Sequence, residues 1–191
     1  EEHPLNAQSP YAATKVGADQ LALAFHRSFE TPVTVLRPFN TYGPRQSARA
    51  VIPTIISQIA AGSRQIRLGS LTPTRDFTFV RDTARGFIQA MSCDEILGQV
   101  TNIGSGFEIS IGDTVHPIAE AMGVDVDVLQ DYDRVRPRAS EVERLFACTV
   151  KAQKTFGWSP EFGGIEGFLR GLKETAEWFK NPVNLAAYKT N

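Results

Sequence analysis

Tyr11 and Lys15 stand four residues apart in a stretch that the sequence predicts to be helical. On a helix this spacing puts both side chains on one face, one turn apart. A phenol, with an ordinary pKa of about 10, is a poor base at neutral pH, and a nearby ammonium group lowers that value by stabilising the phenolate. Such a pair could take a proton from a substrate hydroxyl while hydride leaves the same carbon. The spacing also fits an ordinary exposed helix pair, so the interpretation depends on the rest of the chain.

The overall charge limits which partners the chain could recognise. Its formal net charge is −1, with 42% hydrophobic and 21% charged residues, which is typical of a soluble globular protein. Nothing provides the broad positive field that nucleic acids or membrane surfaces require, so we expect neither partner. An anion would have to be bound by a few arginines, for which Arg75 and Arg138 are candidates. Each also has a simpler reading as a local ion pair, with Asp76 and Glu141 respectively.

The remaining reactive residues predict no metal site and no disulfide framework. Cys93 and Cys148 are far apart and lack flanking ligands. His3, His26 and His116 have no carboxylate or cysteine spaced to work with them, so structural or solvent-facing roles are expected. The chain has no run of about 18 apolar residues that could span a membrane. It starts with acidic residues rather than a signal peptide, which together with unpaired thiols favours a cytoplasmic protein.

Hydrophobic periodicity predicts an α/β fold. Helices are expected over 11–29, about 53–62, 82–92, 110–123 and 164–180, with a further helix starting near 150. Strands are expected over 33–36, 66–68, 77–80, 100–103 and 124–129, and an irregular loop over 40–50. Strands that alternate with helices indicate an α/β protein. Only one or two strands look buried on both faces, whereas a dinucleotide-binding fold needs about six.

Several residues have expected structural roles. Phe77, Phe79 and Trp158 are predicted in the core, and Asp82 is predicted as a cap or a buried hydrogen-bonding group. The helix over 11–29 carries an apolar stripe of Ala18, Leu21, Ala22, Phe25 and Phe29. No G-x-G-x-x-G follows a strand, and the Gly-Ser-Gly at 104–106 is expected to be a structural turn.

A set of motifs in fixed order carries a family resemblance. Ser-Pro-Tyr at 9–11 is followed by R-P-F-N-T-Y-G-P-R at 37–45, V-I-P at 51–53 and R-D-F-T-F-V-R-D at 75–82. N-I-G-S-G at 102–106, R-A-S-E at 138–141, K-A at 151–152 and G-W-S-P at 157–160 complete the set. Together, from residue 3 to about 180, they resemble the extended short-chain dehydrogenase/reductase family of NAD-dependent nucleotide-sugar epimerases, dehydratases and decarboxylases.

The resemblance implies a role for each matching residue. Tyr11 would be the catalytic acid/base, with Lys15 as its partner and as a ligand of the nicotinamide ribose. The other implied contacts are to cofactor and substrate: Pro38, Phe39 and Asn40 at the nicotinamide and sugar-diphosphate side, Val51 and Ile52 at the base, Arg75 and Arg138 at the diphosphate, and Glu141 at the nucleotide ribose. Guanidinium groups suit a diphosphate because they donate bidentate, charge-assisted hydrogen bonds.

The family pattern also implies a domain division. Residues 1–45 would be the tail of a Rossmann NAD-binding domain, and 46–191 mainly the substrate-binding subdomain, with about 76–103 returning to the Rossmann part. The Gly-rich turn and the acidic residue that bind NAD adenosine do not occur in this chain. The chain lacks an initial Met and begins in a predicted loop, so we expect that an N-terminal half is absent and that the fragment alone is inactive. Cys148 stands where the family usually has a capping Asp, so we expect a weaker cap on the helix near 150.

The reaction stays open at the level of the sequence. The run 39–53 together with 69–76 is similar to 4,6-dehydratases acting on UDP- or GDP-N-acetylglucosamine in legionaminic-type sugar synthesis. In that chemistry hydride leaves sugar C4 and returns to C6 after water loss, with an Asp-Glu pair ahead of the Tyr, and that pair cannot be assigned here. A 4-epimerase or decarboxylase with the same Tyr-Lys chemistry is the nearest alternative, and a non-catalytic nucleotide-binding sensor is an alternative of another class. A homodimer paired through the Tyr11 helix is expected from the resemblance.

Overall fold

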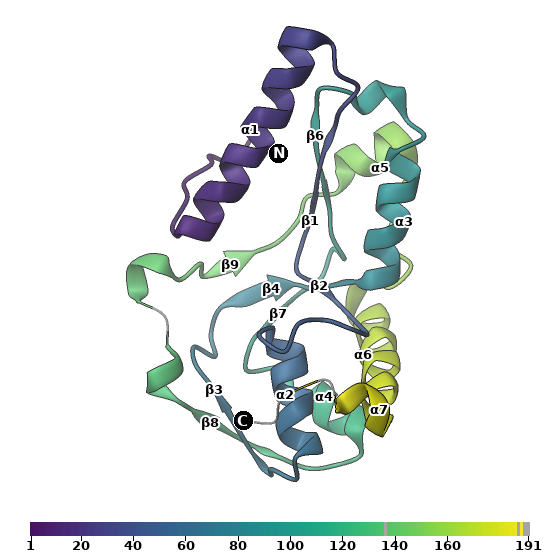
Figure 1. The fold of residues 1–191 in the computed structure, drawn as a ribbon. Helices are drawn as coiled ribbons and strands as arrows, with labels where there is room; N and C mark the ends of the chain where they lie inside the picture. Colours follow the sequence, from purple (N-terminus) through teal and green to yellow (C-terminus); the bar gives the residue numbers. More distant parts are fainter. Residues whose placement is uncertain (136, 187, 189–191) are drawn as a thin grey trace.

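A computed structural model describes residues 1–135, 137–186 and 188 of the chain (Figure 1). Helices and strands follow one another in a mixed α/β arrangement, as predicted. The helices are α1 (Pro10–Phe29), α2 (Val51–Ala60), α3 (Val80–Ala90), α4 (Val115–Met122), α5 (Val150–Phe156), α6 (Gly164–Lys180) and α7 (Pro182–Leu185), with 3-10 turns η1 (Asp94–Ile96), η2 (Tyr132–Arg134) and η3 (Arg138–Ser140). None of the described helices combines the length and apolar character needed to cross a membrane.

The strands pair in several small sheets, mostly in parallel. They are β1 (Val35–Pro38), β2 (Thr41–Tyr42), β3 (Gln65–Leu68), β4 (Thr74–Asp76), β5 (Thr78–Phe79), β6 (Val100–Ile103), β7 (Glu108–Ser110), β8 (Asp127–Gln130) and β9 (Arg144–Leu145). The parallel pairs are β1 with β6, β2 with β5, β3 with β8 and β4 with β9. β4 also pairs antiparallel with β7, so it is central in the order β7-β4-β9. Parallel pairing over long connections is the pattern of α/β folds.

Figure 1 shows two groups of elements that meet near β4. In the upper part of the view, α1 lies on one side of the β1-β6 pair, and α3 and α5 lie on the other. In the lower part, β3 and β8 lie on one side of α2, and α4, α6 and α7 lie on the other. Helix α4 packs against both α2 and α6. In this view the strand β4 lies between the N-terminal end of α1 and the β3-β8 pair.

The largest core cluster fills the lower group. Four isoleucines of α2 are fully or almost fully buried and pack with aromatic residues of β2, β5 and α6; the isoleucines are Ile52, Ile55, Ile56 and Ile59. The predicted core positions Phe77, Phe79 and Trp158 are all buried, at 3%, 1% and 0% exposure. Gly171 of α6 allows a close approach, because a Cβ there would come within 2.1 Å of the Tyr42 hydroxyl oxygen. The predicted buried role of Asp82 is also confirmed, since its carboxylate accepts hydrogen bonds from the backbone N–H groups of 161 and 162.

Long elements were predicted better than short ones. Helix α6 and strand β6 have the expected bounds, and α1 starts one residue early, at Pro10, because the Ser9 side chain caps it. The strand expected at 33–36 lies at Val35–Pro38, and only Val35 is buried. The strand expected at 77–80 ends at Phe79, because Val80 begins α3. The strand expected at 124–129 lies at Asp127–Gln130, and all four of its residues are exposed.

Two local predictions were wrong in detail. The helix expected over 110–123 does not begin at Ser110, which ends β7 and caps a turn, in which its Oγ accepts a bond from the Asp113 N–H at 3.0 Å. The helix itself starts at Val115. The apolar stripe of α1 does not face this chain's core, since Leu21, Phe25 and Phe29 are 61%, 48% and 71% exposed.

Candidate active site

The first turn of α1 positions the predicted Tyr-Lys pair. Ser9 accepts a hydrogen bond from the Ala12 N–H at 3.1 Å, which fixes the start of the helix one residue before Tyr11. The Lys15 Nζ lies over the Tyr11 ring, 5.5 Å from its centroid. Tyr11 is 71% exposed. Within the described part of the chain, neither the Tyr11 hydroxyl nor the Lys15 ammonium has a hydrogen-bond partner, so both can reach a ligand.

A cavity of about 640 Å³ connects Tyr11 with residues far away in the sequence. Its lining includes Tyr11, Asn40, Val51, Arg75 and Glu141, all predicted as site residues. They come from α1, the loop after β1, the start of α2, β4 and the segment after η3. A volume of this size suits an extended small-molecule ligand. The structure therefore brings the predicted acid/base and a predicted anion-binding arginine to the same cavity.

Arg75 forms an ion pair with Glu141 in this cavity. Their closest atoms are 3.1 Å apart, and each side chain is 12% exposed. The alternative of a local pair between Arg75 and Asp76 is not what the structure shows. The Asp76 carboxylate is buried and accepts hydrogen bonds from the Ser105 N–H and hydroxyl, both at 2.7 Å, and from the Ala147 N–H at 3.3 Å. Burial raises the pKa of Asp76 although these hydrogen bonds oppose the shift.

The other predicted site residues are more dispersed. Asn40 lines the cavity and donates through Nδ2 to the Asp76 carbonyl at 3.3 Å. Phe39 is partly buried and Pro38 is exposed. Val51 lines the cavity, but Ile52 is fully buried in the core. Consecutive residues of a helix point in different directions, so the Ile52 side chain is turned from the cavity. The backbone of Arg138 lies in η3, but its side chain lies outside the described residues.

Three arginines in the cavity lining were missed as site residues. They are Arg49, Arg67 and Arg134, which come from the loop before α2, from β3 and from η2. Arg134 pairs with Asp131 at 3.2 Å and is 49% exposed, yet it also borders the cavity. Strand alternation gave a signal for Arg67, since buried Ile66 and Leu68 flank it and force it onto the other face.

The Gly-Ser-Gly segment serves as a structural turn. Ser105 contributes both its N–H and its hydroxyl to Asp76, and Gly106 has a φ of 68°. A Cβ at Gly104 would come within 2.3 Å of the Ala147 Cβ. These contacts agree with the expected structural turn between β6 and β7. Among the described residues, no group of three or more His, Cys, Asp or Glu is arranged to hold a metal ion.

Comparison with known proteins gives a consistent result. Residues 1–170 match the family model described as GDP-mannose 4,6 dehydratase. The low-salt glycan biosynthesis protein Agl12 of Haloferax volcanii is 33% identical over 179 residues, which cover 94% of this chain and 55% of that protein. The chain spans about half the length of the curated relatives it matches.

Two solved structures show the same relationship. The dTDP-glucose 4,6-dehydratase of Bacillus anthracis in complex with NAD is 28% identical, with a TM-score of 0.82 over 95% of this chain and 55% of that chain. The UDP-glucuronic acid 4-epimerase of Bacillus cereus in complex with UDP-glucuronic acid and NAD is also 28% identical, with a TM-score of 0.79 over 93% of this chain and 53% of that chain.

Proposed function

Because the chain belongs to the GDP-mannose 4,6-dehydratase family of the extended short-chain dehydrogenases/reductases, and has the fold of the C-terminal part of these enzymes, we propose that it carries half of an NAD-dependent nucleotide-sugar 4,6-dehydratase. The observation that carries this proposal is the shared cavity, in which Tyr11 and Arg75 border the same space of about 640 Å³. An acid/base and an anion ligand at two places in one cavity suit a substrate with a reactive sugar joined to a diphosphate.

Tyr11 and Lys15 would act on the sugar. As its phenolate, Tyr11 takes the proton from the C4 hydroxyl while hydride leaves C4, and the Lys15 ammonium stabilises that phenolate from the same helical face. Arg75 binds the diphosphate, and Glu141, which now pairs with Arg75, turns to a ribose hydroxyl when the diphosphate takes its place. Val51 provides an apolar contact for the base.

NAD fits the part of the site that this chain contains. The exposed polar atoms of Tyr11 and Lys15 have no partners among the described residues, which leaves them available to a nicotinamide ribose. When bound, NAD supplies reversible acceptance of a hydride, taken from sugar C4 and returned to C6 after the loss of water. The neighbouring segment with Pro38, Phe39 and Asn40 would border the nicotinamide.

The arrangement of elements supports the domain division that the resemblance implies. In this division, residues 1–45 and about 76–103 belong to the Rossmann part, and the rest of 46–191 is mainly the substrate-binding subdomain. In Figure 1 the elements α1, β1, α3 and β6 gather in the upper group, whereas α2, β3 and α6 gather below. Contacts for NAD adenosine and pyrophosphate would come from outside this chain. We therefore propose that the 191-residue chain does not turn over by itself.

A symmetric dimer through α1 is part of the same proposal. Leu21, Phe25 and Phe29 project from α1 with large exposed fractions, and the last two rings lie 5.5 Å apart. Apolar surface of this kind favours burial against a partner. A two-fold axis beside α1 would cover it with the same residues of a second copy.

The substrate that we propose is UDP- or GDP-N-acetylglucosamine, on the strength of the similarity over 39–53 and 69–76. A 4-epimerase that uses the same Tyr-Lys chemistry is the second candidate, because one matching structure is a UDP-glucuronic acid 4-epimerase. The two reactions give different products from the same C4 oxidation. A dehydratase releases a 4-keto-6-deoxy sugar, whereas an epimerase returns an inverted C4 hydroxyl.

The test is to incubate the complete gene product with NAD and each of UDP-N-acetylglucosamine, GDP-N-acetylglucosamine, dTDP-glucose and UDP-glucuronic acid, and to follow products by NMR. We expect a 4-keto-6-deoxy product from an N-acetylglucosamine nucleotide. Replacing the acid/base, Tyr11→Phe, should lower kcat by roughly 10²- to 10⁴-fold. The matched control is Tyr132→Phe, at an exposed tyrosine of η2 that does not line the cavity. Inversion at C4 without water loss would favour the epimerase, and full activity of Tyr11→Phe would refute the proposed chemistry.

A further inference from the structure

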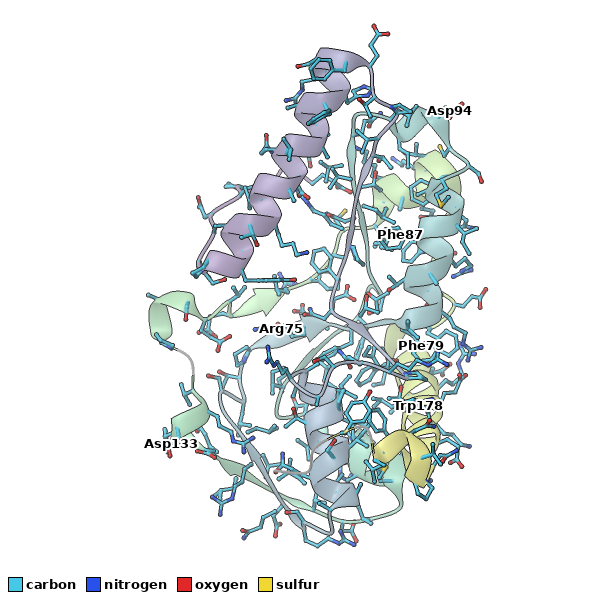
Figure 2. All side chains as sticks on the ribbon, in the orientation of Figure 1. Arg75, Phe79, Phe87, Asp94, Asp133 and Trp178 are labelled. Atoms are coloured by element: carbon cyan, nitrogen blue, oxygen red, sulfur yellow. The ribbon has the colours of Figure 1, made fainter. Side chains whose placement is uncertain are left out.

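Arg67 and Arg134 line the cavity from β3 and η2, which lie away from α1 in Figure 1, and Arg49 lines it from the loop before α2. Arg49, Arg67 and Arg134 are called here the outer arginines. In Figure 2 the labelled Asp133 marks η2 at the lower left, and the labelled Arg75 marks β4 between η2 and the start of α1. A nucleotide sugar with its sugar at Tyr11 and its diphosphate at Arg75 would direct its nucleoside toward the outer arginines. The role inferred for these arginines rests on the proposed function, which sets this orientation of the ligand.

The backbone of Arg67 is held by two hydrogen bonds to the side chain of Gln58. Its N–H donates to the Gln58 Oε1 at 2.8 Å, and its carbonyl accepts from the Gln58 Nε2 at 3.2 Å. These bonds satisfy the edge of β3 that does not pair with β8. Strand β3 is thereby fixed to helix α2 at this residue. The side chain of Arg67 is presented from a braced strand rather than from a loop.

A close backbone approach brings Arg134 to the same end of the cavity. The Asp131 N–H donates to the Leu68 carbonyl at 2.7 Å, which continues the β3-β8 pairing into η2. A Cβ on Gly69 would lie 2.4 Å from the Arg134 carbonyl oxygen, so only glycine permits this approach. The Asp131 carboxylate then holds the Arg134 guanidinium at 3.2 Å. The position of η2 against β3 is therefore a built feature of the fold.

The charges in the cavity lining are only partly compensated. Four arginines line the cavity, against a single lining carboxylate, Glu141. Glu141 pairs with Arg75, and Asp131 pairs with Arg134. In the described part of the chain, the guanidinium groups of Arg49 and Arg67 have no hydrogen-bond or ion-pair partner. The cavity thus has guanidinium groups in excess of carboxylates.

We propose that Arg67 is a specificity-determining residue that selects a guanine nucleotide over uridine and thymidine nucleotides. Guanine presents two adjacent acceptors, N7 and O6, which match the two parallel N–H groups of a guanidinium. Uracil and thymine separate their carbonyl oxygens by an N–H donor, so one guanidinium cannot bind both. A fork held by the Gln58 brace, with η2 and Arg134 packed against the neighbouring Gly69, suits the guanine edge.

The experiment measures the dissociation constants of GDP, UDP and dTDP with the complete gene product by isothermal titration calorimetry. In the wild type, GDP should bind tightest. The informative variant is Arg67→Lys, which keeps the positive charge but loses the planar fork. It should weaken GDP by roughly 5- to 150-fold, the worth of one bidentate base contact, and change UDP and dTDP far less. Arg64→Lys is the matched control, since Arg64 is an exposed arginine three residues earlier that does not line the cavity.

The outcomes separate this inference from the proposed function. If UDP or dTDP binds the wild type as tightly as GDP, or if Arg67→Lys weakens all three alike or none, the selectivity assigned to Arg67 is wrong while the nucleotide-sugar site stands. If no nucleoside diphosphate binds the wild type, the proposed function fails and this inference fails with it.

Discussion

Replacing the buried carboxylate beside Arg75, as Asp76→Asn, tests how the site is held together. The Asp76 carboxylate accepts three hydrogen bonds, two from Ser105 and one from the Ala147 N–H, and its backbone carbonyl accepts the Asn40 amide. All the groups that point at the carboxylate are donors. An asparagine can accept with one atom only, so its amide nitrogen would face a second donor, at Ala147.

The loss of stability depends on how many buried donors the substitution leaves without an acceptor. Two buried donors, the new amide and the Ala147 N–H, would have no acceptor in the variant, at a cost of about 1–3 kcal/mol each. Removal of the negative charge offsets part of this cost, because burial of that charge is the main cause of the raised pKa of Asp76. We expect a net loss of about 2–3 kcal/mol, which lowers Tm by about 4–12 °C in a chain of this size.

The assay is thermal unfolding of wild type and variant at several pH values. A carboxyl group whose pKa is raised in the folded state adds stability below its unfolded pKa and loses that contribution as pH rises through its folded pKa. The wild type should therefore gain stability relative to Asp76→Asn as pH falls from neutral toward the ordinary aspartate range. The control is Asp94→Asn, at an exposed carboxylate on η1 (Figure 2). An Asp76→Asn protein with wild-type Tm and no pH-dependent difference would refute this account of the donors around Asp76.

Two further predictions concern the surface. The hydrogen bonds from Arg144 lower the pKa of Glu108 to about 2, so the contribution of Glu108 to the free energy of unfolding is complete above the ordinary glutamate value of 4.5 and is lost as pH falls toward 2. In Glu108→Gln, the loss of stability with falling pH should therefore be less steep in that window. Identical acid unfolding curves for wild type and variant would contradict this. If α1 pairs with a second copy, Phe25→Glu should convert a dimer to a monomer in light scattering after size exclusion, because it places a charge beside Phe29. The control Met91→Glu, at an exposed position directly after α3, should leave the mass unchanged. A Phe25→Glu protein that is still dimeric would exclude α1 as the dimer contact.

Sequence patterns located the long elements because periodicity accumulates over many residues. Helix α6 has the predicted bounds; of the apolar residues that its periodicity places on one face, Phe168, Leu172, Ala176 and Phe179 are buried, whereas Ile165 and Leu169 are 45% and 40% exposed. The short strands β2, β4, β7 and β9 have two or three residues each, too few for any alternation to be visible. They exist because distant segments pair, which local sequence cannot report.

The candidate site divides in the same way. Motifs identified Tyr11, Lys15, Arg75 and Glu141, whose types at fixed spacing suit particular chemistry. The outer arginines were missed because their place in the cavity comes from tertiary structure: β3 is braced by Gln58, and η2 approaches Gly69. The Arg75–Glu141 pair was also beyond sequence reasoning, since it joins β4 to a segment 66 residues later.

The position of the Tyr-Lys pair relative to Arg75 depends on how α1 is attached to β1. The Arg37 guanidinium in β1 binds the Asp19 carboxylate in α1 at 2.7 Å, and Leu23 is the one described residue of the helix that is fully buried. At the far end of the helix, the His26 Nδ1 lies 2.9 Å from the Thr31 carbonyl oxygen. Because β1 runs on into Asn40, which is bonded to β4 through the Asp76 carbonyl, these contacts form one path from the helix of Tyr11 to the strand of Arg75. The path crosses between the two groups of elements seen in Figure 1, so the geometry of the proposed site rests on a few polar contacts rather than on a shared core.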